Sequence, residues 1–501
     1  MTFNIHRARV RRLGVLAMVA GALSLASCSK DKILTIVDPD VINPADLATP
    51  AAAEALRVGA LARLIFATTG FTGGSLGDGA YFFGGLVADE LRSGDTFVQR
   101  DQADQRSILT TNSAMTESAR QIYRVRTAAL QAIPALIQYV PTQQSSVGQM
   151  YWLKGYAENM LAENFCNGTP ISSLGADGII TYGDPETNAQ VYARALVSFD
   201  SAVLNAPAGQ LRSDTVKLLA AVGKGRTLMN LGQYAAAAVA VATVPDNFRF
   251  VISHSTATID NQVWALNNSA GRYQLGEKDG IVGLNFATAN DPRVPACVGG
   301  SVACKTFDPG QTRTRSFDNV GFGPGLSGGP FYVQLVFPTR DADAVIVSGT
   351  EARLLEAEAF LRGGDVANWL VKLNYLRANF NTFKQISNPC SASGAQITGC
   401  PLIPADGTLL PPLADPGTQT AREDLTFRER AFWMFMTGHR LADLRRLVRP
   451  ASEGGYGRTE NSVYPNGQYL KGGFYGTDKM LILPQAEENN PQFHGCANRD
   501  P

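Results

Sequence analysis

The sequence has 501 residues, of which 45% are apolar, and it carries equal numbers of basic and acidic side chains, 44 of each. A chain of this length can form one large domain or two to three smaller ones, and its apolar content indicates an ordered core rather than a disordered chain. The zero formal net charge provides no attraction of the whole molecule to nucleic acid, so we expect no nucleic-acid partner.

The first 28 residues have the pattern of an exported lipoprotein. Basic residues at 7–12 precede an apolar run at 13–25 that is too short to span a bilayer. The run ends in Leu-Ala-Ser-Cys, where small residues precede a cysteine that becomes the lipidated first residue of the mature chain. We therefore expect a lipoprotein signal peptide over 1–27, lipidation of Cys28, and a lipidated tether over 28–48. A plain signal peptide, with Cys28 incidental, is the alternative.

Residues 49–244 are rich in helix patterns. Thr49-Pro50 has the form of a helix start, with threonine as the N-cap and proline in the first turn. Apolar residues then recur at helical spacing in four further segments, which are 116–139, 149–166, 190–206 and 215–231. We therefore predict an N-terminal helical scaffold over 49–244.

Two helix pairs resemble tetratricopeptide units. The first pair is joined by Leu-Gly-Gln-Tyr at 231–234, and the second runs from Val345 to Leu361, through Gly-Gly-Asp, into a helix that ends at Asn379. Small residues at helix crossings let neighbouring pairs stack. We predict a mainly α fold with a tetratricopeptide-like scaffold, to which a helical repeat pair over 339–384 belongs. Two unrelated helical hairpins are the alternative.

Two stretches, 245–338 and 385–424, have few helical periods. We expect the first to be an irregular, ligand-facing region with short strands at 248–252 and 331–337, and the second to be a loop insertion. Exposed aromatic rings beside polar groups suit sugar binding, although any single ring is more often a core residue. The candidate ligand contacts are Trp264, Tyr273, Phe331, Tyr332, Phe474 and Tyr475, with Tyr81, Phe82 and Phe83 as further candidates.

Residues 425–447 are the most informative stretch, and we predict one buried core helix there, at the start of a C-terminal region over 425–501. Six consecutive apolar residues, 431–436, require burial on every side of a helix. Polar residues flank this run, and Arg440 and Asp443 are three apart, so they are neighbours on a helix. The expected structural core motif, an ion network rather than a catalytic site, consists of Glu429, Arg430, Gly438, Arg440 and Asp443.

Six cysteines remain after Cys28, an even number that favours disulfides in an exported protein. Short spacings suggest two local pairs and leave a third, which gives Cys297–Cys304, Cys390–Cys400 and Cys166–Cys496. In the chain-entropy model, each local disulfide would stabilise the folded state by about 2–3 kcal/mol. The alternative is that some of the six are free buried thiols.

The sequence contains little catalytic chemistry. Residues 73–77 match G-x-S-x-G, but an alanine-rich helix precedes them, where a nucleophile elbow needs a strand. No two histidines of the mature chain have metal-ligand spacing, and adjacent carboxylates such as Asp89-Glu90 point apart on a helix. We therefore predict no enzyme activity, no metal site and no cofactor. A secreted hydrolase that uses Ser75 or a carboxylate pair is a rival hypothesis.

The motif E-R-x7-G-H-R-x-x-D-L-R-R over 429–446 resembles the C-terminal core motif of the SusD/RagB family, which are bacterial outer-membrane lipoproteins that capture nutrients. Trp433 and Thr437 stand where the family usually has glutamates. The lipobox, the helix pair within 340–379, and the tail over 480–491 are similar to the family as well, and all four features occur in the family's order.

This resemblance implies a lipid-anchored protein of the outer membrane, at the cell surface, that binds an oligomeric nutrient, glycan or peptide, without altering it. It implies a SusC-like TonB-dependent transporter as the partner, over which the subunit works as a hinged lid. The further rival is a helical-repeat lipoprotein that scaffolds envelope assembly.

Overall fold

The computed structural model describes residues 48–70, 78–94, 96–175, 179–299, 330–384 and 410–499. The chain divides into two units, 1–53 and 54–501. The first helix, α3 (Pro50–Thr68), begins at the predicted proline, and Thr49 Oγ1 accepts a hydrogen bond from Ala52 N at 3.1 Å. The predicted signal peptide, Cys28 and most of the tether lie outside the described residues. In the described ranges, no helix has both the length and the apolar character needed to cross a lipid bilayer.

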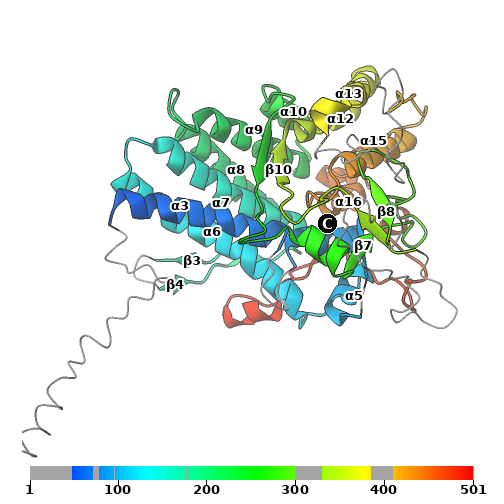
Figure 1. Ribbon diagram of the computed structural model, residues 1–501, viewed down its shortest axis with the longest axis horizontal. Helices are drawn as coiled ribbons and strands as arrows, with labels where there is room; N and C mark the ends of the chain where they lie inside the picture. The colour runs from blue at the N-terminus through cyan, green and yellow to red at the C-terminus, as the bar shows by residue number, and fades with distance from the viewer. Residues whose placement is uncertain are drawn as a thin grey trace, which may run out of the picture. The chain divides into compact units, whose positions relative to one another are not determined.

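Helices that follow one another in the chain pack side by side in the larger unit (Figure 1). The series runs through α6 (Ser113–Tyr139), α7 (Gln144–Asn164), α8 (Asn188–Leu204), α9 (Ser213–Asn230) and α10 (Tyr234–Val241). It continues as α12 (Gly349–Arg362) packs on α10, and α13 (Val366–Ala378) packs on α12. The predicted mainly α fold of stacked helices is therefore confirmed.

The ring of Phe199 on α8 fills space that glycines leave on the helices beside it. A Cβ atom on Gly155 of α7 would lie 2.9 Å from this ring, and one on Gly223 of α9 would lie 2.6 Å from it. A larger residue at either position would push the helices apart. Glycine costs about 1 kcal/mol relative to alanine inside a helix, and here that cost permits three helices to approach closely.

Short antiparallel strand pairs lie among the helices. The pairs are β1 (Leu91–Ser93) with β7 (Tyr273–Leu275), β2 (Thr169–Pro170) with β5 (Pro185–Glu186), β3 (Ser173–Leu174) with β4 (Ile180–Thr181), β6 (Arg249–Ile252) with β10 (Ala344–Ser348), and β8 (Ala296–Val298) with β9 (Tyr332–Gln334). A π-helical turn, η2 (Trp264–Ser269), contacts both β7 and β9. The predicted strands at 248–252 and 331–337 are thus present, the second shorter than expected.

Several shorter elements complete the described chain. They are the α-helices α4 (Ala80–Ala88), α5 (Val98–Asp104) and α14 (Phe380–Phe383), and the 3₁₀ turns η5 (Ala451–Glu453), η6 (Glu460–Ser462) and η7 (Gln485–Asn489).

The helix that we predicted from Val345 begins later than expected. Residues 344–348 form β10, and α12 starts at Gly349. Three β-branched residues in succession, 345–347, favour a strand, and β6 supplies the partner for it. Ser348 then caps the helix, because its Oγ accepts a hydrogen bond from Glu351 N at 3.3 Å.

The predicted single helix over 425–447 is two helices, α15 (Gln419–Trp433) and α16 (Arg440–Val448). Between them, Met436 and Gly438 have φ angles of 54° and 80°, which a right-handed helix cannot contain. A Cβ atom on Gly438 would lie 2.4 Å from the ring of Tyr81, so this ring packs directly on the backbone. The apolar run is buried as predicted, but burial alone does not distinguish a buried helix from a buried turn.

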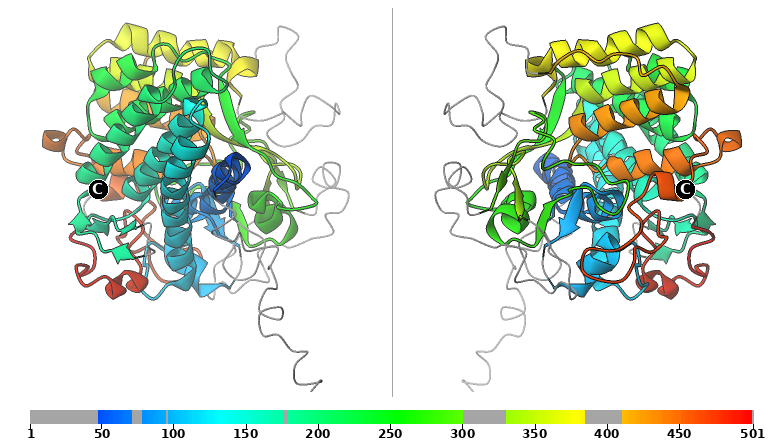
Figure 2. Two further views of the ribbon diagram at one scale, coloured as in Figure 1. Left: turned by 90° about the vertical axis from the view of Figure 1, so that its left-hand side faces the viewer. Right: turned by 90° about the vertical axis from the view of Figure 1, so that its right-hand side faces the viewer.

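An apolar cluster joins α12, α13, α14 and α15, which lie together in Figure 2. Trp433 belongs to it, with its ring centroid 5.9 Å from that of Phe380. Trp369 Nε1 donates a hydrogen bond to Thr426 Oγ1 at 2.8 Å, which ties α13 to α15. Trp433, one of the two departures from the family's motif, therefore fills an apolar site where a glutamate would be buried.

Candidate functional site

The charged residues of the C-terminal motif form ion pairs in the protein interior. Glu429 accepts hydrogen bonds from Arg293 Nη1 and Arg377 Nη1, each at 2.7 Å, and Arg430 pairs with Asp443 through two contacts of 2.9 Å. All five side chains are buried. Removing one partner of such a pair leaves an uncompensated charge and costs about 3–5 kcal/mol. These buried pairs form a structural ion network of the kind that we predicted.

The spacing of three residues suggested that Arg440 and Asp443 are neighbours, but Arg440 does not pair with Asp443. Its Nε and Nη2 donate to Asp89 at 2.9 and 3.2 Å, because Arg440 is the first residue of α16 and α16 packs against α4, which Asp89 ends. Asp443 instead accepts from Arg430 and from Arg446, the latter at 2.9 Å. Burial raises the pKa of Asp443, but the charges of Arg430 and Arg446 outweigh burial and hold this pKa below its usual value.

Five of the predicted ligand aromatics are core residues. Tyr273 and Phe331 are 0% and 7% exposed, and Tyr273 OH donates to Asp78 Oδ2 at 2.7 Å. The others are Tyr81, Phe82 and Phe83, each at most 2% exposed on α4. These five side chains are buried and cannot contact a ligand at the surface. Short elements need apolar side chains that pack against the scaffold, and these aromatic residues provide them.

Four aromatic side chains remain accessible, and we call them the aromatic group: Trp264, Tyr332, Phe474 and Tyr475. The first two lie on η2 and β9, which are in contact, whereas the other two follow one another in a C-terminal loop. Burial raises the pKa values of both tyrosines, and the positive charge of Arg92 lowers both. The β1–β7 pair contacts both halves of the group, because Gln274 Oε1 on β7 accepts a hydrogen bond from Tyr332 N at 3.4 Å and Ser93 Oγ on β1 accepts one from Lys471 Nζ, in the loop of Phe474 and Tyr475, at 2.9 Å.

The loop that carries Phe474 is held in place by several contacts. The rings of Tyr469 and Tyr475 meet edge to face at 5.3 Å, and Gln105 Nε2 donates to Phe474 O at 2.9 Å. Lys471 Nζ donates to Ser93 Oγ at 2.9 Å. The ring of Phe474 is nevertheless 74% exposed. It is an apolar face presented to solvent on a supported loop, which suits stacking on a ligand.

A cleft of about 740 Å³, which the sequence analysis missed, lies at the ends of α8, α9 and α16. We call it the arginine cleft. Its polar and charged lining includes Asn167, Asn188, Asn230, Arg445, Arg446, Arg449, Glu453, Arg458, Glu460, Lys479 and Asn498. The signal in the sequence was three arginines at positions 445, 446 and 449; we assigned the first two only to the core motif and did not consider the third.

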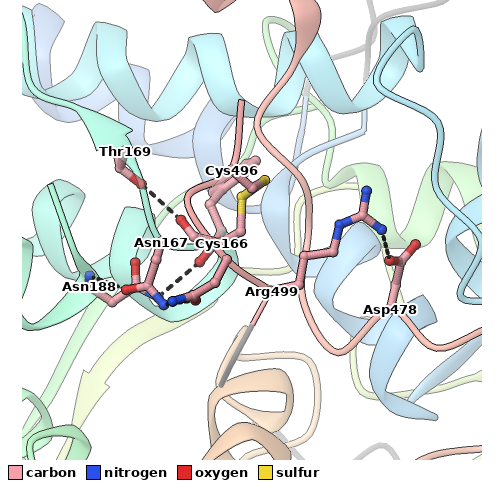
Figure 3. The surroundings of a disulfide bond; sticks show 9 residues. Cys166, Asn167, Thr169, Asn188, Asp478, Cys496 and Arg499 are labelled. Carbon is pink, nitrogen blue, oxygen red and sulfur yellow. Dashed lines mark hydrogen bonds and ion pairs between the residues drawn. A yellow bond between two sulfur atoms is a disulfide. The ribbon is translucent and has the colours of Figure 1, made fainter. Parts of the chain in front are cut away.

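Figure 3 shows a disulfide whose sequence neighbour Asn167 lines this cleft. It joins Cys166 to Cys496, whose Cα atoms lie 5.8 Å apart although 330 residues separate them in the chain. Beside it, Asn167 Nδ2 donates to Asn498 Oδ1 at 2.8 Å, and both asparagines line the cleft. This pairing is the one predicted.

The other predicted pairs and the rival nucleophile involve residues that the structure does not describe. Cys304, Cys390 and Cys400 lie outside the described residues, so Cys297–Cys304 and Cys390–Cys400 stay predictions. Ser75 lies outside them as well. Among the residues that are described, no three His, Cys, Asp or Glu side chains are grouped so that they could hold a metal ion.

No family model matches the sequence, and no curated protein matches it. Among solved structures, a SusD superfamily protein from Bacteroides vulgatus is 13% identical, with a TM-score of 0.57 over 89% of this chain and 98% of that one. A SusD-like carbohydrate binding protein from Bacteroides fragilis is 12% identical, with a TM-score of 0.57 over 89% and 99%. A SusD superfamily protein from Parabacteroides distasonis is 11% identical, with a TM-score of 0.59 over 89% and 99%. Likeness at this level of identity establishes a shared fold.

Proposed function

We propose that this chain, which has the fold of the SusD superfamily, is a lipid-anchored outer-membrane protein of the SusD/RagB family. In this proposal it captures an oligomeric nutrient, glycan or peptide, and delivers it to a SusC-like TonB-dependent transporter. The observation that carries the proposal is the fold match over about nine-tenths of the chain, together with the lipobox that ends at Cys28. Two of the matched structures are described as carbohydrate binding proteins.

The aromatic group is the ligand site that we propose. Pyranose rings present flat C–H faces, and aromatic side chains are the apolar surfaces on which such faces stack, while a few polar groups fix the orientation. Phe474 is exposed, Tyr475 follows it in the chain, and Tyr332 carries a further accessible hydroxyl group on β9. Connecting segments of this kind, supported by a rigid scaffold, commonly carry binding residues.

Binding of purified protein to glycan and peptide arrays tests the capture function. We expect retention of an oligosaccharide or peptide family that is not hydrolysed on prolonged incubation. Turnover of the bound ligand, lost in Ser75→Ala, would favour the hydrolase instead. The absence of binding to any oligomer, with the protein shown to be folded, would contradict the capture function.

Membrane fractionation tests the anchor separately. We expect Cys28→Ala to release the protein from membranes, because multiple acyl chains on Cys28 provide the stable attachment. Lys30→Ala is the matched control, since it alters the same tether without removing the lipidated residue, and it should stay in the membrane fraction. Firm membrane association of Cys28→Ala would refute the lipid anchor.

A further inference from the structure

We propose that the arginine cleft is a second binding site, specific for a singly charged carboxylate with neighbouring hydrogen-bonding groups. Two sources share this chemistry, a sugar acid and the C-terminus of a peptide. None of the residues that line the cleft belongs to the aromatic group. The inference rests on the geometry of the cleft and does not depend on the proposed capture function.

The size and construction of the cleft suit a small organic ligand. Its volume of about 740 Å³ falls within the range of about 300–1,000 Å³ that is usual for small-molecule sites. Its walls come from the first turn of α8, the end of α9, and α16 with the segment that follows it. The remaining wall contains Asn167 and Asn498, which are hydrogen bonded to each other and each lie within two residues of a cysteine of the Cys166–Cys496 disulfide.

Two arginines of the cleft have no carboxylate partner among the described residues. Arg445 Nη1 donates to the carbonyl oxygens of Ala162 and Glu163 at 2.7 and 2.6 Å, and Arg449 Nη1 donates to the carbonyl oxygen of Asn230. These carbonyls belong to the last turns of α7 and α9. Burial lowers the pKa values of both arginines, so each positive charge is desolvated without a counterion. An anion in the cleft would supply one.

The neighbouring charges of the cleft are already neutralised. Arg446 pairs with Glu358 at 2.8 Å and with Asp443 at 2.9 Å. Arg458 pairs with Asp424 at 2.8 Å. The excess positive charge therefore belongs to Arg445 and Arg449, with Lys479 nearby, rather than to the whole lining.

Two features select a monocarboxylate among anions. Glu453 and Glu460 also line the cleft. Glu460 is already paired with Arg106 at 2.5 Å, so the negative charge that disfavours a dianion such as phosphate is that of Glu453. Asn188 Oδ1 is buried in the lining and has no hydrogen-bond partner among the described residues, so it can accept from a donor such as a hydroxyl or amide group. A guanidinium recognises a carboxylate through two parallel hydrogen bonds, which fits a carboxylate flanked by such donors.

A purely structural role for these arginines is the competing explanation, because a positive charge near a helix C-terminus is stabilising by itself. Each arginine, however, donates to its helix end through Nη1, and Arg449 Nη2 makes a further contact of 3.4 Å with Gly454 O. Lys479 Nζ lies 4.0 Å from Glu460 and donates to no helix-end carbonyl in the described part of the chain. A structural role predicts that ligand binding does not respond to these side chains.

Calorimetric titration of the full mature chain distinguishes the two explanations. The probes are D-galacturonate, N-acetyl-L-alanine, D-galactose and inorganic phosphate, at low and at physiological ionic strength. We expect galacturonate or N-acetylalanine to bind, and galactose and phosphate to bind at least tenfold more weakly. The preferred carboxylate identifies the source. Binding should weaken as salt rises. Equal binding of galactose and galacturonate, stronger binding of phosphate, or no binding of either carboxylate would overturn the proposal.

Variants assign the binding to the cleft. Arg449→Gln should weaken carboxylate binding at least tenfold, and Lys479→Gln at least threefold. If Arg449→Gln does not fold, Lys479→Gln alone decides. Arg340→Gln removes an arginine that is about half exposed, outside the cleft, and should have no effect. Phe474→Ala should also have none, which separates failure of this site from failure of the proposed capture function. Unchanged carboxylate binding in the folded cleft variants would overturn the assignment.

Discussion

The ion-paired interior and the aromatic group differ in how each uses its side chains. In the interior, Glu429, Arg430 and Asp443 are buried and ion-paired with one another or with arginines distant in the chain. In the aromatic group, Phe474 is held by its backbone while its ring is exposed. Substitutions in the ion-paired interior therefore reduce stability, whereas substitutions in the aromatic group can alter the chemistry of its surface without disturbing the fold. A binding protein built in this way can keep one scaffold and vary its ligand.

The largest effect should come from breaking the interior network. Asp443→Ala leaves two buried arginines, Arg430 and Arg446, with Glu358 as their one remaining carboxylate, and we expect the free energy of unfolding to fall by about 3–5 kcal/mol in urea denaturation. Arg340→Gln, which breaks an ion pair with an arginine about half exposed, is the matched control and should cost at most about 1 kcal/mol. Equal losses in the two variants would contradict the contrast between interior and surface charges.

Removal of the Cys166–Cys496 disulfide should cause the next largest loss of stability. Cys496→Ser removes a cross-link that closes a loop of 330 residues, and we expect a loss of about 2–5 kcal/mol, measured by thermal or denaturant unfolding. The wild-type protein treated with a reducing agent should lose a similar amount. A variant as stable as the wild type would show that the cross-link adds nothing to the interior packing.

The interior should also respond to pH through Glu90. Met436 N donates to Glu90 Oε1 at 3.2 Å, while Oε2 is buried without a partner in the described part of the chain. Burial raises the pKa of Glu90 from 4.5 to about 8. The folded protein thus retains a proton that the unfolded chain releases above pH 4.5. The stability linked to this group is therefore complete below pH 4.5 and is lost as the pH rises from there toward 8.

This linkage predicts a slope of about 1.4 kcal/mol per pH unit in the free energy of unfolding between pH 5 and pH 8. Glu90→Gln should remove that slope and be more stabilising, relative to the wild type, at pH 8 than at pH 5. Asp214→Asn, at an exposed position on α9, should leave it unchanged. An identical slope in Glu90→Gln and the wild type would contradict a buried, protonated Glu90.

Phe474→Ala, a change in the aromatic group, should have the smallest effect on stability. Loss of a stacking surface should weaken ligand binding about fivefold to tenfold, roughly 1 kcal/mol, in a titration with the ligand found on the arrays. Stability should stay within about 0.5 kcal/mol of the wild type. Val239→Ala, which removes an exposed apolar side chain from α10, should change neither property. Unfolding of Phe474→Ala would show that the two regions are not separable.

The sequence predicted what short-range rules determine. The start of α3 at Pro50 followed from its cap, and the ends of α7, α8 and α9 lie within two residues of the predicted positions. It failed where a partner lies far away in the chain, as when Arg440 pairs with Asp89, 351 residues distant, instead of its neighbour Asp443. It also failed within 434–439, because an apolar run with a single glycine resembles a helix until Tyr81 is placed against Gly438.

The candidate sites were harder to predict than the fold. Among the aromatic residues, Tyr273 and Phe474 have similar sequence surroundings, yet one is fully buried and the other is 74% exposed. Exposure depends on which side of a short strand or loop meets the scaffold, and a strand of three residues has too little periodicity to show it. The arginine cleft depends on three helix ends that meet only in the folded chain.

Co-purification of the native protein from detergent-solubilised outer membranes tests the central claim most directly. The account predicts that a large TonB-dependent barrel protein is recovered with it and is retained by Phe474→Ala, which alters only the ligand site. Recovery without any barrel protein, or with envelope-assembly factors in its place, would contradict the account.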